Sequence, residues 1–304
     1  MAYQIGFFAY LRLKLFVALL RGFMALHGFL PTPAKSPSSS PTPAPILVNW
    51  HGSCWVFSLH GTDELYCRRI AAEASMYVLD ADYRKGPETP YPGPLHDVED
   101  ALRWVASWSP TSPSRPSIPD VNIDTTRVAL SGFSAGGQLA LVASSACRKK
   151  TTLANLGLGI AAVVAVYPET DLSLAPEVKT ARTARPIRPH PAWFLDLFHD
   201  SFVPDGALRE TALVSPSKAD VGDFPRVVAM MTAEGDIYSP EALELAGRLE
   251  DEDGEGKRKV VVVNSEGVYH GFDKGPEEGS KEWERREECY GAVVECLREA
   301  LGTV

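Results

Sequence analysis

The stretch ALSGFSAGGQLAL, residues 129–141, decides how the rest of the chain is interpreted. Gly132, Ser134 and Gly136 make the pattern G-x-S-x-G between a segment typical of a strand and one typical of a helix. In that context the pattern predicts a nucleophile elbow, a turn so sharp that the serine backbone is strained and its hydroxyl projects above a sheet. The start of a helix beside it stabilises negative charge. The sequence therefore predicts Ser134 as a nucleophile.

A serine nucleophile needs a base that takes its proton and a carboxylate that orients the base. In this arrangement the chain order is Ser, then Asp or Glu, then His. His270, in EGVYHGFD, follows both the elbow and a late predicted strand. The segment TAEGDIYSPEA, after the preceding predicted strand, offers Asp236 and Glu234. We favour Asp236 because it lies beyond the glycine turn, and Glu234 stays the alternative.

Other titratable residues receive plainer interpretations. His190 and His199 are expected to be lid or surface residues rather than bases, and His96 a helix residue. Four basic residues between 172 and 222 are expected to form a solvated face, with recognition of an acidic substrate group as the alternative: Lys179, Arg182, Arg185 and Arg188.

Short apolar segments alternate with helical segments along the chain. The expected strands are residues 45–50, 76–84, 127–133, 159–169, 225–235 and 259–267. The expected helices are residues 63–75, 94–108, 135–150, 239–252 and 281–301. Such alternation predicts an α/β fold with a mostly parallel central sheet and helices on both faces. Residues 172–222 interrupt it with prolines and aromatic residues, which predicts an inserted lid.

Bulk composition limits the partners. The 304 residues carry a net charge of −9, which argues against a nucleic-acid partner because phosphate binding needs a basic face. Five cysteines without a CxxC pair favour reduced thiols and a cytoplasmic location, without excluding a single disulfide bridge or secretion.

The N-terminal residues predict a separate element. Residues 1–30 are apolar but interrupted by Arg12, Lys14 and Arg21, so their longest uncharged run falls far short of the roughly 20 residues that a membrane span needs. They predict an amphipathic lid helix, either packed on the body or in peripheral contact with a membrane. Residues 31–45 are a Pro/Ser-rich linker. Residues 46–304 form the predicted catalytic domain.

Several longer motifs occur in one order: HGSCW, DADYRKGPETPYPGPLHDVEDALRWV, GFSAGG, YPETDLS, TAEGDIYSPEA and YHGF. Over residues 46–300 this series resembles the hormone-sensitive-lipase-like family of α/β hydrolases, especially its fungal members. The resemblance implies an α/β-hydrolase fold with a helical lid, and Ser134, Asp236 and His270 as the triad. It implies no metal or cofactor. Members of the family have a pair of strands before the strand that leads into HGSCW. The linker is too short to supply this pair, so either the sheet lacks its first strands or the gene model is shortened.

The loop HGSCW, residues 51–55, matches the family's HGGG loop. The resemblance implies that the backbone N–H groups of Ser53, Cys54 and Ala135 bind the oxyanion, with His51 and Gly52 supporting the loop. Ser and Cys keep these donors but lack the conformational freedom of glycine, so the hole is expected to be intact but narrower.

Together these features predict a serine hydrolase, carboxylesterase- or lipase-like, that cleaves carboxylic esters of apolar, small-to-medium substrates through an acyl-enzyme. One alternative is an enzyme of secondary metabolism that performs cyclisation, elimination or acyl transfer on the same fold. The other is a non-catalytic binding protein. The expected partner is a small-molecule ester, and the oligomeric state stays open.

Overall fold

The computed structural model describes Lys14 and residues 42–303, apart from residues 119–120, 150, 253–255 and 257. The helix predicted over residues 1–30 lies outside the described residues, Lys14 excepted, as does most of the linker predicted over residues 31–45. Both stay predictions. The same holds for the first strands, since the described chain starts two residues before the first strand.

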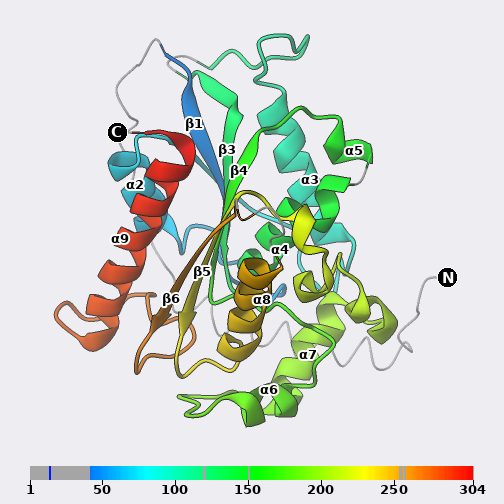
Figure 1. The fold of residues 1–304 in the computed structure, drawn as a ribbon. Coiled ribbons are helices and arrows are strands. Elements are labelled where there is room, and N and C mark those ends of the chain that lie inside the picture. The colour runs from blue at the N-terminus through cyan, green and yellow to red at the C-terminus, as the bar shows by residue number, and fades with distance from the viewer. Residues whose placement is uncertain are drawn as a thin grey trace.

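The described residues build one parallel sheet of six strands (Figure 1). The strands are β1 (Ala44–Trp50), β2 (Tyr77–Ala81), β3 (Ile123–Phe133), β4 (Ile160–Val166), β5 (Val227–Ala233) and β6 (Lys259–Ser265). Their order is β2-β1-β3-β4-β5-β6, and every neighbouring pair is parallel. The predicted α/β fold with a parallel central sheet is therefore confirmed.

Helices cover both faces of the sheet because successive strand residues point to opposite sides. On one face, Val48 and Trp50 of β1 pack with α3 (Gly93–Ala106), α4 (Ala135–Ser144) and α8 (Ser239–Asp251). On the other face, Leu47 packs with α2 (Glu64–Glu73) and α9 (Lys281–Leu301). Figure 1 shows α2 and α9 together on one side of the sheet and α3, α4 and α8 on the other.

The helix predicted over residues 135–150 is shorter in the structure. The α-helix ends at Ser144, and a 3₁₀ turn, η1 (Ala146–Lys149), and the four-residue α5 (Thr151–Ala154) follow. The hydroxyl groups of Ser144 and Ser145 both donate to the carbonyl of Leu141. Such side-chain bonds compete with backbone helix bonds and favour a helix end.

The strand order reverses between β1 and β3, which positions the site. The chain passes from β1 outward to β2 and then returns to β3 on the other side of β1. In open α/β sheets, ligands bind at the carboxyl ends of the strands beside such a switch point. The HGSCW loop follows β1 and the predicted elbow follows β3, so both predicted site segments meet there.

Residues 172–222, the predicted insertion, lie between β4 and β5. This segment contains α6 (Pro176–Arg182), α7 (Ala192–Phe202) and the 3₁₀ turns η2 (Gly206–Glu210), η3 (Pro216–Lys218) and η4 (Val221–Asp223). Figure 1 shows α6 and α7 below α8, at the end of the molecule where β5 and β6 finish. In the part of the chain that the structure describes, no helix is both long and apolar enough to cross a membrane.

Candidate active site

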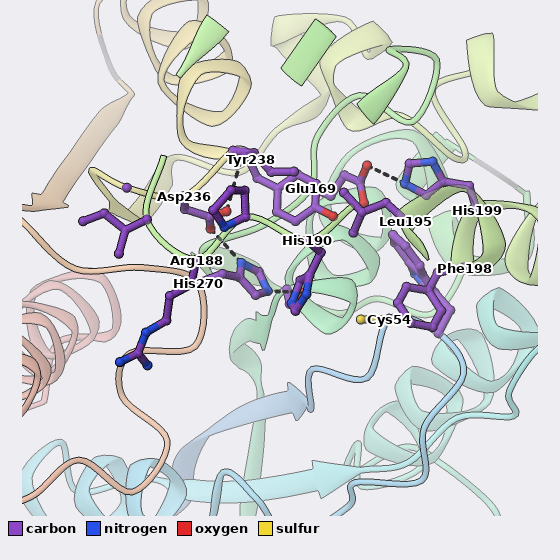
Figure 2. Close-up of a pocket in the computed structure, with 16 residues that line it drawn as sticks. Cys54, Glu169, Arg188, His190, Leu195, Phe198, His199, Asp236, Tyr238 and His270 are labelled. Atoms are coloured by element: carbon purple, nitrogen blue, oxygen red, sulfur yellow. Dashed lines mark hydrogen bonds and ion pairs between the residues drawn. The ribbon is translucent and has the colours of Figure 1, made fainter. Parts of the chain in front are cut away.

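Ser134, His270 and Asp236 form a continuous chain of contacts. The Ser134 Oγ lies 2.9 Å from His270 Nε2, and His270 Nδ1 lies 2.7 Å from the Asp236 Oδ2. Figure 2 shows the ring of His270 directed toward the carboxylate of Asp236. Because an ionised carboxylate only accepts hydrogen bonds, Nδ1–H donates to Asp236. Nε2 is then free to accept the proton of the Ser134 hydroxyl.

The local chain conformation holds Ser134 at a sharp turn between β3 and α4. Its backbone has φ 50° and ψ −117°, a conformation that non-glycine residues adopt only under strain. Gly136, two residues later, lies so close to the end of β1 that a Cβ there would overlap the Trp50 carbonyl oxygen. The glycine therefore lets the turn lie directly against the strand that precedes the HGSCW loop.

Two tyrosines hold the imidazole of His270 between them. The ring centroids of Tyr167 and Tyr238 lie 4.7 Å and 5.3 Å from that of His270. The backbone N–H of Tyr238 also donates to the Asp236 Oδ1 at 3.2 Å, which uses the second carboxylate oxygen. The carboxylate and the imidazole are thus both fixed in orientation.

The environment favours the protonated form of His270. Burial alone would lower the pKa of its imidazole, but the charge and hydrogen bond of Asp236 outweigh burial and raise the pKa above its usual value. A base that must hold the serine proton during catalysis benefits from this because the imidazolium is stabilised as it forms.

The remaining candidates lie elsewhere. Glu234, the alternative carboxylate, is exposed and accepts a hydrogen bond from the backbone N–H of Gly267 at 2.8 Å. His96 lies on the exposed side of α3. His199 belongs to the insertion, but the expectation that it could be a surface residue is wrong, because only 2% of it is exposed. His190 lies at the edge of the pocket beside Ser134.

The HGSCW loop presents the backbone groups that the resemblance assigns to the oxyanion. Within the described part of the chain, the N–H groups of Ser53, Cys54 and Ala135 donate to no other protein atom. Ala135 is the first residue of α4, where N–H groups have no intrahelical partner. Cys54 and Trp55 have φ values of 50° and 57°. Cys54 thus adopts the left-handed conformation that glycine would adopt more readily.

Side chains from the loop after β2 support the HGSCW loop. His51 Nε2 lies 2.9 Å from Asp82 Oδ1, and its Nδ1 lies 3.0 Å from the Gly52 carbonyl. The Tyr83 hydroxyl donates to the His51 carbonyl at 2.9 Å, so the Ser53 hydroxyl, 2.6 Å away, must donate to Tyr83. The side chain of Ser53 is thus directed into the protein and away from the substrate.

Cys54 is not activated. Burial, with a smaller contribution from the Glu169 carboxylate, raises the pKa of its thiol to about 12, so it is protonated at neutral pH. All five cysteines are free thiols in the structure. Cys54 therefore fills space at the pocket wall rather than supplying a nucleophile.

Substitutions at Cys54 should separate the backbone effect from the side-chain effect. Cys54→Gly is expected to keep kcat/KM for an acetyl ester within about threefold, because glycine adopts a positive φ without strain. Cys54→Val is expected to lower it by about tenfold or more, because a β-branched residue resists this conformation and shifts an oxyanion donor worth about 2.7–4 kcal/mol. Equal activity of the two variants would contradict an oxyanion role for this loop.

A small cavity opens beside Ser134. Its volume is about 50 Å³. Apolar side chains on its wall are those of Cys54, Trp55, Ile187, Pro189, Leu195, Phe198, Ile237 and Tyr238. Figure 2 shows Leu195 and Phe198, from α7, near Cys54. The insertion therefore supplies a wall of the pocket.

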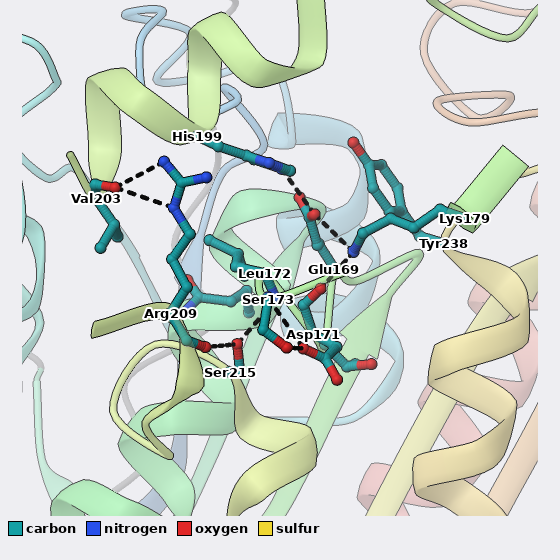
Figure 3. A network of polar contacts seen from close by, with 12 residues as sticks. Glu169, Asp171, Leu172, Ser173, Lys179, His199, Val203, Arg209, Ser215 and Tyr238 are labelled. Atoms are coloured by element: carbon teal, nitrogen blue, oxygen red, sulfur yellow. Dashed lines mark hydrogen bonds and ion pairs between the residues drawn. The ribbon is translucent and has the colours of Figure 1, made fainter. Parts of the chain in front are cut away.

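A buried ionic network lies behind this wall (Figure 3). Lys179 Nζ lies 2.8 Å from Glu169 Oε1 and 2.6 Å from Glu241 Oε2, and His199 Nε2 lies 2.8 Å from Glu169 Oε1. Lys179 has 1% of its side chain exposed, so the expectation that it belongs to a solvated face is wrong. The network joins α6, α7 and α8 to the loop after β4.

Sequence reasoning did not assign roles to several residues of the site. Tyr83 and Glu169 stood inside quoted motifs, DADYRKGPETPYP and YPETDLS, but nothing in a single sequence showed what they contact. The position of Arg188 in the pocket lining also depends on how the insertion folds back. Among the described residues, no group of three or more His, Cys, Asp or Glu side chains could hold a metal ion.

Comparison with known proteins gives the wider relationship. The chain is 35% identical over 105 residues to "Esterase LipI" of Mycobacterium tuberculosis, which covers 34% of this chain and 30% of that protein. It is 34% identical over 128 residues to "Versiconal hemiacetal acetate esterase" of Dothistroma septosporum, covering 42% and 35%. These matches span about a third of the length of either relative.

A solved structure shares the fold. The esterase of the archaeon Pyrobaculum calidifontis has a TM-score of 0.67 and 24% identity, covering 84% of this chain and 77% of that one. Residues 47–274 match the family described as the alpha/beta hydrolase fold and lie within residues 46–300, over which the motifs show the resemblance. The chain belongs to the alpha/beta hydrolase fold family.

Proposed function

We propose that this protein is a serine carboxylesterase that cleaves short-acyl esters of small molecules. The observation that carries the proposal is the chain of contacts from Ser134 through His270 to Asp236, at 2.9 Å and 2.7 Å. It is supported by relatives whose names describe esterases, one of them a hemiacetal acetate esterase. The reaction needs these side chains, backbone N–H groups and water.

The proposed reaction has two halves. Ser134 Oγ attacks the ester carbonyl carbon while His270 Nε2 takes the hydroxyl proton, and the N–H groups of Ser53, Cys54 and Ala135 stabilise the oxyanion. Nε2 then gives the proton to the alcohol oxygen as the bond to the acyl carbon breaks. In the second half, water attacks the acyl-enzyme, His270 takes its proton and returns it to Ser134, and the carboxylic acid leaves.

The pocket favours short acyl groups. A volume of about 50 Å³ corresponds to roughly two water molecules at about 30 Å³ each, so the cavity suits a short acyl group such as acetyl. Phe198 lines the cavity together with Glu169 and His199 of the buried ionic network, and moving these side chains would expose apolar surface or separate buried charges. We therefore narrow the expected small-to-medium substrates to short acyl chains.

We also propose roles for the segments around the site and a biological setting for the enzyme. The insertion at residues 172–222 acts as a lid, and residues 1–30 complete it or contact a membrane surface from the cytoplasm. The hemiacetal acetate esterases of Dothistroma septosporum and Aspergillus parasiticus among the relatives favour a fungal-type member acting in secondary metabolism.

A series of p-nitrophenyl esters tests the function. We expect the highest kcat/KM between acetate and butyrate and a loss of about tenfold or more at octanoate, because a tight pocket discriminates strongly per methylene. Phe198→Ala should shift the optimum to longer chains. Trp193→Ala, on the same helix but 62% exposed, is the matched control and should not.

Two outcomes would count against the proposal. An optimum at long chains would contradict the short pocket. No turnover of any ester, together with no labelling of Ser134 by a fluorophosphonate, would exclude a serine esterase.

A further inference from the structure

Arg188 differs from the other charged residues that line the pocket. Asp236 pairs with His270, and Glu169 pairs with Lys179 and His199. Arg188 is exposed and, among the described residues, forms no ion pair. Residues 1–41 contain neither Asp nor Glu, so the N-terminal segment cannot supply a carboxylate partner. Within the described part of the chain, Arg188 is therefore the one charged residue of the pocket lining without an opposite charge, in a protein whose net charge is −9.

The segment that carries Arg188 is held in a defined conformation. It reads PIRPHP, residues 186–191, and we call it the proline strap. Its three prolines restrict the backbone φ. Arg188 has φ 52° directly before Pro189, a conformation that sterics disfavour for a non-glycine residue and especially for one before proline. Such a conformation persists only where surrounding contacts impose it, and it is commonest at functional sites.

Those contacts come from the turn that carries the catalytic carboxylate. The Ile187 N–H donates to the Gly235 carbonyl at 2.9 Å. A Cβ on Gly235 would lie 2.5 Å from Ile187 Cγ1, so the absent side chain makes room for Ile187. Asp236 is the next residue. The proline strap is thereby fixed relative to Asp236 and His270.

Arg188 lies on the side of His270 that faces away from α7 and Cys54 (Figure 2). Figure 2 shows its side chain extending past His270 and away from Leu195, Phe198 and Cys54. Its guanidinium carbon lies 4.1 Å from the ring centroid of Tyr269, the residue before His270. Stacking on an aromatic face leaves the N–H edges of a guanidinium available to an anion.

The chemistry of the proposed reaction identifies which part of a substrate meets Arg188. His270 Nε2 must reach the alcohol oxygen to protonate it, so the alcohol part lies on the His270 side. The carbonyl oxygen must reach the N–H groups of Ser53 and Cys54, and the acyl chain takes the direction that remains, into the cavity lined by Leu195 and Phe198. Arg188 therefore faces the alcohol part of a bound ester.

We propose that Arg188 binds a carboxylate carried by the alcohol part, so that the preferred substrates are short-acyl esters of hydroxy acids. The guanidinium presents parallel N–H donors that match a carboxylate in two-point contact. This inference rests on the proposed esterase function and names its substrate class.

The experiment compares kcat/KM for 4-acetoxybenzoate and for its uncharged methyl ester. The wild-type protein is expected to favour the charged ester by about threefold to fivefold, as a charge-assisted contact with an exposed guanidinium provides. Arg188→Gln should bring the ratio close to one, and Arg188→Lys should retain part of the preference. Arg185→Gln, exposed on the same segment but outside the pocket lining, is the matched control and should leave the ratio unchanged. Added salt should reduce the preference of the wild-type protein for the charged ester, and it should leave the ratio measured for Arg188→Gln unchanged.

Each remaining outcome has a definite meaning. Turnover of both esters without preference, or a preference that Arg188→Gln leaves intact, would overturn the role of Arg188 while leaving the esterase function standing. Failure to hydrolyse either ester, with Ser134 unlabelled by a fluorophosphonate, would overturn both. Thermal unfolding of Arg188→Gln at the wild-type temperature would show that the changed ratio does not reflect misfolding.

Discussion

Asp236→Asn is expected to lower kcat for an acetyl ester by about 10⁴-fold while leaving the protein folded. The Asp236 carboxylate accepts from His270 Nδ1 at 2.7 Å. An asparagine amide at the same place can donate to Nδ1, which would put the imidazole proton on Nε2. His270 could then no longer accept the proton of Ser134, although all heavy atoms kept their places. Steady-state kinetics with p-nitrophenyl acetate measure the loss.

Glu234→Gln is the matched control for that variant. Both carboxylates lie in the turn after β5, but Glu234 is exposed and bonded to the Gly267 N–H rather than to His270. Its substitution is expected to change kcat by no more than about threefold, since an exposed polar contact contributes little. A larger loss with Glu234→Gln than with Asp236→Asn would reverse the assignment of the orienting carboxylate.

The elbow and the sheet could be predicted because their signals are local. The G-x-S-x-G pattern, the apolar run before it and the helical run after it are contiguous, so a single sequence contains the whole argument. Chain order and loop position were enough to favour Asp236 over Glu234. The exact end of α4 was not predictable in this way, because it depends on whether Ser144 and Ser145 bond to the backbone or to solvent.

The environment of the insertion could not be predicted because its partners are distant in sequence. Lys179 occurs in the basic segment KTARTAR, which resembles a solvated face. Its buried partners, Glu169 and Glu241, lie 10 and 62 residues away, and no periodicity connects them. Arg188 could not be separated from Arg185 for the same reason. The fold of the insertion places one beside His270 and leaves the other exposed outside the pocket lining.

Lys179→Met is expected to destabilise the protein by about 3–5 kcal/mol, the usual cost of removing one partner from a buried ion pair. Lys179 Nζ contacts Glu169 and Glu241 and donates to the Asp171 carbonyl at 2.6 Å. Methionine of similar length fills the space but leaves two buried carboxylates without their shared cation. Urea unfolding measures the change in the free energy of unfolding.

Lys218→Met is the matched control in the same insertion. Lys218 also pairs with a carboxylate, Asp171, at 3.0 Å, but 35% of its side chain is exposed. Solvent screens such a pair, so its loss should cost less than about 1 kcal/mol. Similar destabilisation by the two variants would contradict a special role for the buried network.

The stability lost in Lys179→Met should depend on pH because of two carboxyl groups, those of Glu169 and Glu241. Burial works to raise the pKa of Glu169, but His199 and Lys179 outweigh it and lower the pKa to about 2. For Glu241, burial and the Glu169 charge outweigh Lys179 and raise the pKa. Removing Lys179 moves both pKa values upward. Where folding raises the pKa of a carboxyl group, the group favours the folded protein fully below its unfolded-state pKa. This contribution is lost as the pH rises through the folded-state pKa.

The loss of stability in Lys179→Met should therefore shrink as the pH falls from about 9 to about 5, because Glu241 has a pKa of about 7 with Lys179 present and a higher pKa without it, and its protonation removes the unpaired charge. Adding Glu241→Gln should recover part of the lost stability at pH 9, because it removes the carboxylate that is left without a cation, whereas Glu169 keeps its contact with His199. The double variant is not expected to gain activity toward long acyl esters, because Phe198 still lines the pocket. A deficit that is equal at both pH values and unchanged by Glu241→Gln would show that lost packing, and not the unpaired charge, causes the destabilisation.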